Sequence, residues 1–285
     1  MSELSALQAP APVGSAPLVP APLAPAVWQR HTLAERLLRY GVWLLVVAAI
    51  VQSLRTVEVI PEFLVDAPQQ MLDMVQRMWP PDWRHYPQSV HAALVETLHI
   101  ASLGTIASLV MAVPLGLLVA ANVTPSKPLN LLARVVLVTS RSVNSLVWAL
   151  LFVAVFGPGA LAGAIAISFR SVGFVGKLLG EALEQAPRGP IEALQAAGAS
   201  RLAVVRYGYW PAVKPAFWSI VLLRWDINVR ESAVLGLVGA GGIGMVLDTA
   251  LNLFQWPRVA MVIVAIFSVV VLAELAVTRL RKHLL

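Results

Sequence analysis

Long runs of apolar residues limit the possible folds of this chain more than any other feature of the sequence. The clearest run covers residues 258–278, and the others cover residues 40–55, 93–121, 131–155, 160–178 and 213–238. A helix needs about 20 mostly apolar residues to cross the hydrocarbon core of a bilayer. Because 58% of the residues are apolar and only 13% are charged, we predict an all-α, polytopic membrane protein with about six transmembrane helices.

The remaining composition narrows the domain organisation and the possible chemistry. Residues 1–27 are rich in alanine and proline, which favours a disordered tail, so residues 28–285 form the predicted membrane domain. The chain has no cysteine, which excludes a disulfide framework and cysteine-based zinc or redox motifs. Its five histidines form no recognisable metal-binding pair. The net charge of +6 suits membrane topology better than nucleic-acid binding, because the bases flank apolar runs.

The distribution of basic residues predicts the orientation of the chain. With both termini on the inner side, the inner segments hold Arg30, Arg36, Arg39, Lys127, Arg134, Lys177, Arg188, Arg201, Arg206, Lys214, Arg279, Arg281 and Lys282. The outer segments then hold only Arg55, Arg77, Arg84 and Arg258. Lysine and arginine concentrate in cytoplasmic loops, so we predict cytoplasmic termini and a cytoplasmic loop over residues 179–212.

That loop contains the unusual stretch EALQAAGASRLAVVRYGYWPAVKP, residues 192–215. Its first residues favour a helix, and Gly198 permits a tight turn. Ser200 can cap a second helix beginning at Arg201, which we expect to end at Trp210 and Pro211. An ordinary basic inner loop is the alternative interpretation.

The spacing within this stretch resembles the EAA loop of permeases from ABC importers. Glu192, Ala193, Leu194, Gly198 and Pro211 match the family pattern by position, although Leu194 replaces the usual second alanine. Gly208 and Trp210 also replace usual aliphatic residues. The resemblance implies a type I ABC importer permease fold in which this loop couples the membrane domain to an ATPase subunit.

A second segment, RWDINVRESAVLGLVGAGGIG, contains the pattern G-x-G-x-x-G at its end. A dinucleotide site requires a preceding strand and a following amphipathic helix, whereas an apolar membrane run precedes the glycines here. We therefore expect Gly239, Gly241, Gly242 and Gly244 to break the helix at the outer face. A short interfacial helix over residues 245–256 is expected to follow.

Charged and polar groups within the membrane runs are candidates for a substrate path. They are Arg141, Asn144, Arg170, Arg224, Asn228 and Arg230, and Asp226 is spaced to form a structural ion pair with Arg230. Ionised groups at mid-bilayer are costly, so they face partners or a water-filled path. Arg141 and Arg170 have no acid nearby in the sequence and could contact an oxyanion. Structural pairing is the alternative for all of these residues.

The second segment, the stretch MWPPDW and the terminal RLRKHLL, together with the EAA loop, resemble phosphonate-class permeases of ABC importers. The resemblance implies uptake of phosphonate, phosphite or hypophosphite across the bacterial inner membrane. It also implies separate ATPase subunits, a periplasmic substrate-binding protein and a second permease copy, which we expect to be identical. We expect no cofactor, no catalytic residue and no nucleic-acid partner. A permease for another ligand such as methionine, or a secondary transporter driven by an ion gradient, are the alternatives.

Overall fold

The computed structural model describes residues 33–57, 61–124 and 126–284, which form helices and connecting turns but no strand. The helices confirm the predicted all-α class. The predicted disordered tail over residues 1–27 lies outside the described residues. The chain divides into two units, one ending at Asp66 and the other beginning at Ala67.

The first unit contains α1 (Leu33–Thr56), none of whose residues is buried. Helix α2 (Pro61–Met78) crosses the division between the units. The second unit contains α3 (His91–Val119), α4 (Lys127–Ser142), α5 (Ser145–Phe156), α6 (Ala160–Glu184), α7 (Arg188–Ala196), α8 (Arg201–Ala203), α9 (Trp210–Leu235), α10 (Ile243–Asn252) and α11 (Trp256–Leu284). Short 3₁₀ or π turns cover Trp83–His85, Tyr86–Val90, Val204–Tyr209 and Gly236–Val238. Five of these helical segments are long and apolar enough to cross a membrane, or six if α4 and α5 count as one span.

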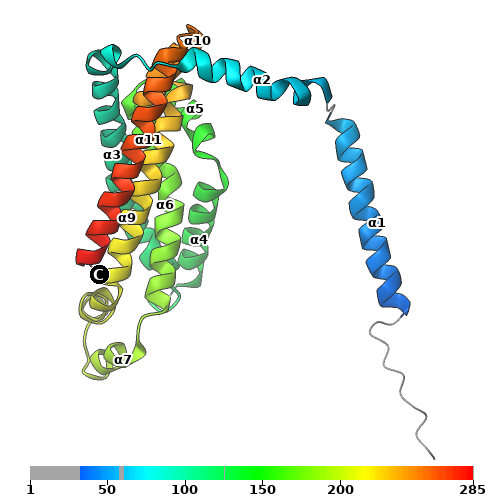
Figure 1. Cartoon of the computed structure of the whole chain (residues 1–285). Coiled ribbons are helices and arrows are strands. Elements are labelled where there is room, and N and C mark those ends of the chain that lie inside the picture. The colour runs from blue at the N-terminus through cyan, green and yellow to red at the C-terminus, as the bar shows by residue number, and fades with distance from the viewer. Residues whose placement is uncertain (1–32, 58–60, 125, 285) are drawn as a thin grey trace, which may run out of the picture. The chain divides into compact units, whose positions relative to one another are not determined.

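Helices α3 and α6 pack closely at the centre of the second unit because small residues line their contact. A Cβ atom added at Gly104 of α3 would lie 2.8 Å from Ile167 of α6, and one added at Gly180 would lie 2.8 Å from Val119. Small residues allow helix backbones to approach in a membrane, where burying apolar surface gives no advantage over lipid. In Figure 1, α7 lies at one end of this bundle and α10 at the other.

The span predicted over residues 131–155 is divided in the structure. Helices α4 and α5 meet at an angle of 90°. Val143 and Asn144 between them have extended backbones, and the Asn144 side chain accepts a hydrogen bond from the backbone N–H of Leu146 at 3.1 Å. Asn144 therefore caps α5, which explains why two helices form where one apolar run was predicted.

The predicted helix end at Trp210 and Pro211 is wrong. Helix α9 begins at Trp210, directly after the π turn Val204–Tyr209. Pro211 lies in the first turn of α9, where the missing N–H of proline leaves no helical hydrogen bond unmade. The charged α9 is therefore a continuous extension of the segment that follows α7.

Candidate functional site

A chain of buried hydrogen bonds joins α9 to α6 and α3 inside the bundle. The Arg224 Nε donates to the Ser171 hydroxyl at 2.8 Å, and that hydroxyl lies 3.1 Å from the Asn228 carbonyl oxygen. The Asn228 amide donates to the Thr105 hydroxyl at 2.7 Å. All four residues are buried. Arg224 and Asn228, both predicted from the sequence as path candidates, therefore belong to one network that fixes three helices together.

Glu231 pairs with two arginines at one side of this network. One carboxylate oxygen contacts Arg170 of α6, and the other lies 3.3 Å from Arg224 Nη2. Arg170 also donates to the Ser145 hydroxyl at the start of α5, at 3.3 Å. Arg170 is thus not a spare cation, because folding supplies an acid that lies 61 residues away in the sequence. The three side chains together carry one net positive charge.

Arg230, another path candidate, is part of a separate ion-pair group. Its guanidinium lies 2.5 Å from the Asp226 carboxylate and 3.6 Å from the Glu274 carboxylate on α11. The Asp226 pair follows the i, i+4 spacing expected for one helix face. Arg230 therefore links α9 to α11, and the structure does not bring it into the Glu231 cluster.

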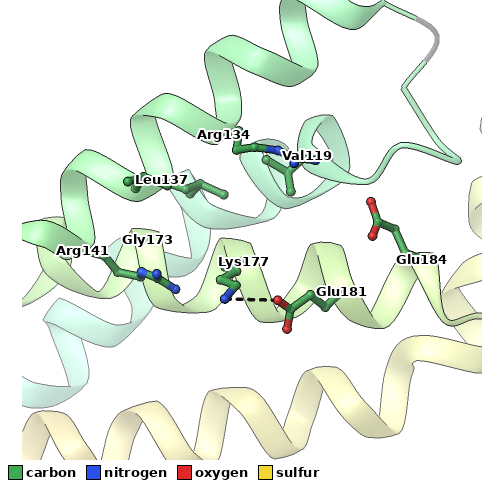
Figure 2. A pocket seen from close by; sticks show the side chains of 9 residues that line it. Val119, Arg134, Leu137, Arg141, Gly173, Lys177, Glu181 and Glu184 are labelled. Atoms are coloured by element: carbon green, nitrogen blue, oxygen red, sulfur yellow. Dashed lines mark ion pairs between the residues drawn. The ribbon is translucent and has the colours of Figure 1, made fainter. Parts of the chain in front are cut away.

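Arg141 makes no hydrogen bond or ion pair with the residues that the structure describes. It lines a groove of about 300 Å³ between α4 and α6. Figure 2 shows Arg141 on α4 opposite Gly173 of α6, with Lys177 and Glu181 following along α6. The groove is also lined by Val119, Arg134, Leu137, Val138 and Glu184. Three cations and two acids make its lining net positive.

The glycines after α9 form a tightly packed turn that begins α10. Gly239, Gly241 and Gly242 have positive φ angles of 84°, 84° and 72°, a conformation that favours glycine. The Ile243 N–H after this turn donates to the Thr97 hydroxyl of α3 at 2.8 Å. A Cβ atom at Gly244 would lie 2.3 Å from the Ala233 carbonyl oxygen. The structure thus breaks the helix at Gly239, Gly241 and Gly242, whereas Gly244, which was also predicted to break it, lies in the first turn of α10. Helix α10 covers most of the predicted residues 245–256.

Helix α7 presents Glu192 and Ala193, two residues of the EAA-like spacing, on its exposed side. The helix is followed by Gly198, whose φ of +75° allows the tight turn, and the Ser200 hydroxyl accepts a hydrogen bond from Ala203 N–H at 3.3 Å. The turn orients α7 against the π segment that leads into Pro211 and α9. Helix α7 therefore packs against the segment that leads into α9.

Leu194 and Gly208, two departures from the family pattern, contact each other in the structure. A Cβ atom at Gly208 would lie 3.2 Å from Leu194 Cδ1 and 3.4 Å from Ile191 Cγ1. The absence of a side chain at Gly208 thus makes room for the larger residue at position 194.

We expect Gly208→Leu to destabilise the α7 contact by about 1–3 kcal/mol, the usual cost of overpacking. Combining it with Leu194→Ala restores the volume and should recover most of that loss. Thermal unfolding of the purified chain in detergent measures both variants. Equal melting temperatures for the single and double variants would contradict the compensation.

Sequence reasoning missed several polar residues of the site. Ser171 and Thr105 look like ordinary helix residues, since nothing in the sequence marks them as buried partners of Arg224 and Asn228. Lys177 could have been found, because it lies seven residues after Arg170 and therefore on the same helix face. Among the described residues, no group of three or more His, Cys, Asp or Glu could hold a metal ion.

Comparison with known proteins places these features in a family. Residues 112–285 match the family described as "Binding-protein-dependent transport system inner membrane component". The phosphite transport system permease protein PtxC of Stutzerimonas stutzeri is 38% identical over 204 residues, covering 72% of this chain and 74% of the relative. The phosphate-import permease protein PhnE of Mycolicibacterium smegmatis is 35% identical over 237 residues, covering 83% of this chain and 44% of the relative.

The fold also resembles a solved transporter structure. An inward-facing structure of the MetNI methionine ABC transporter superposes with a TM-score of 0.60 at 22% identity. The match covers 69% of this chain and 96% of that chain. At this identity the likeness concerns the fold alone.

Proposed function

The chain belongs to the binding-protein-dependent transport system inner membrane components, the permeases of ABC importers, and we propose that it carries phosphonate, phosphite or hypophosphite inward. A permease of this kind acts with ATPase subunits and a substrate-binding protein. We further propose that two identical copies form the pathway in a bacterial inner membrane, with the termini in the cytoplasm. The chain itself then performs no covalent chemistry.

The cationic cluster inside the bundle is the observation that carries the substrate assignment. Arg170, Arg224 and Glu231 hold one net positive charge between α6 and α9, and Arg141 lies unpaired in the neighbouring groove. Arginine donates well-directed hydrogen bonds to phosphorus oxyanions. A net positive cluster attracts an anion and repels a cation, which supports a phosphorus oxyanion as the cargo.

The coupling of ATP hydrolysis to transport rests on α7 in this proposal. Glu192 and Ala193 contact the ATPase subunit, and closure of the two ATPases moves the α7 helices. Because α7 turns directly into the π segment and α9, that movement reaches the helix that holds Arg224 and Glu231. The helices then open toward the binding protein, which releases its anion, and hydrolysis returns them to the inward-open state.

We expect Glu192→Arg to abolish coupling. Reversal places a cation where the ATPase receives a carboxylate, and like charges at an interface cost several kcal/mol, so uptake should fall about 100-fold or more. Cells without their own phosphorus-oxyanion importers would express the chain with its ATPase and binding protein. Uptake of phosphite, hypophosphite and a simple alkylphosphonate would then be measured.

The matched control is Gln195→Arg, which adds the same side chain to the same helix. Gln195 lines a hollow facing residues 121–124 of its own chain, so this variant should retain uptake. ATP-dependent uptake of one compound names the cargo. Uptake that survives Glu192→Arg and needs only an ion gradient would show a secondary transporter instead, and an assembled complex that carries none of the three would require another ligand.

A further inference from the structure

Three cationic side chains, two from α6 and one from α4, follow one another along the length of α6. Arg170 and Lys177 are seven residues apart on this helix, which is about 10.5 Å along its axis. Gly173 lies between them, and a Cβ atom there would lie 3.1 Å from Arg141 Cγ and 2.4 Å from the Leu137 carbonyl oxygen. The glycine therefore lets α4 approach α6 and lets the Arg141 side chain lie between the levels of the two α6 cations.

We propose that Arg170, Arg141 and Lys177 form a cation track that conducts a small phosphorus oxyanion from the α4–α5 bend toward the α7 end of the bundle. The inference rests on the proposed function and adds Lys177 and the order of the three positions. Arg141 lies beside Gly173, at a level between Arg170 and Lys177, so an anion can contact the next position before it leaves the last.

The cations of the track belong to apolar helices that are candidates for crossing the membrane, and this supports a water-filled path. Charged side chains within a membrane-spanning helix avoid lipid and face a partner or water. Arg141 and Lys177 line the groove between α4 and α6 together with Arg134, Glu181 and Glu184. Arg170 lies outside this lining, beside the start of α5. A groove of about 300 Å³ holds several water volumes of about 30 Å³ each, which is sufficient for a small hydrated oxyanion.

The acids of the groove explain how an anion could leave the track. Lys177 Nζ lies 3.3 Å from the Glu181 carboxylate, and both side chains are about half exposed. Glu231 similarly pairs with Arg170, and it also pairs with Arg224. Each carboxylate competes with the cargo for its cation, which keeps binding weak at Arg170 and at Lys177. Conduction requires this combination of several attractive positions and weak retention.

The absence of cysteine from the chain allows a direct test of charge at position 177. The Lys177→Cys permease would be assembled with its ATPase and binding protein in liposomes. We expect uptake of phosphite or the transported phosphonate to fall about tenfold, as for the loss of one hydrogen bond to a charged group. Labelling with methanethiosulfonate ethylammonium restores a cation of similar length and should restore uptake. The negatively charged sulfonatoethyl reagent should not.

Lys214→Cys is the matched control, since Lys214 is also exposed but lies on α9 outside the groove. It should transport normally before and after both reagents, as should the unmodified complex. If Lys177→Cys fails to assemble, Arg141→Cys tests the same track with the same reagents.

The outcomes separate the two proposals. An unmodified complex that assembles but carries no phosphorus oxyanion overturns the proposed function and the ligand of the track with it. An unmodified complex that transports, together with a Lys177→Cys variant that transports equally well, overturns the track alone. Restoration by both reagents would also overturn it, because a size effect rather than charge would then explain the loss.

Discussion

Glu231→Gln is expected to destabilise the chain more than substitution of Arg170, the more exposed of its two arginine partners. Glu231 is the carboxylate shared by Arg170 and Arg224, and Arg224 retains only 4% side-chain exposure. Removing the acid leaves a buried guanidinium without a counter-charge, which typically costs about 3–5 kcal/mol. Arg170→Gln should cost about 1 kcal/mol or less, because Arg170 is one-third exposed and Glu231 keeps its contact with Arg224.

Thermal unfolding of the purified permease in detergent tests this order. The two variants remove one charge each and substitute the same neutral side chain, so the difference between them reports the position of the charge. Similar melting temperatures for both would show that Arg224 finds another partner or is hydrated. In that case the shared carboxylate would not hold α6 and α9 together.

The sequence was sufficient for features that depend on local spacing. Apolar runs predicted the membrane helices, because a bilayer selects for hydrophobicity independently of tertiary packing. Helix geometry brings residues at i and i+4 together, which predicted the Asp226–Arg230 ion pair. In the structure the Arg230 guanidinium lies 2.5 Å from the Asp226 carboxylate. Four glycines around Gly241 were expected to interrupt a helix because they lack side chains. Three of them lie in the break before α10, and Gly244 lies within α10.

Features that depend on packing could not be predicted in the same way. Arg170 and Glu231 are far apart in the sequence, and only the packing of α6 against α9 brings them together. The bend after Ser142 contains no glycine or proline, so an apolar pattern gave no reason to divide the span. The helix end predicted at Trp210 and Pro211 was wrong although a proline is present there. Proline is tolerated in the first turn of a helix and therefore does not by itself mark a helix end.

The glycine turn approaches α6 closely at Gly163. A Cβ atom there would lie 2.3 Å from the Ala240 carbonyl oxygen and 3.3 Å from Ile100 Cγ2. Gly163 lies within α6 and has no positive φ angle, so a larger residue meets a steric limit rather than a conformational one. The close contact is with backbone, which cannot move aside as a flexible side chain can.

We therefore expect Gly163→Ala to destabilise the chain by about 1–3 kcal/mol, the usual cost of overpacking, despite the higher helix propensity of alanine. Gly189→Ala is the matched control, because Gly189 lies in helix α7 and a Cβ atom there meets nothing within 4 Å. The control should be stabilised by about 0.5–1 kcal/mol. Opposite shifts in thermal unfolding would show that α6 supports the glycine turn through this contact. If Gly163→Ala instead stabilised the chain like the control, the turn would be free to move relative to α6, and movement of α9 would not need to carry α6 with it.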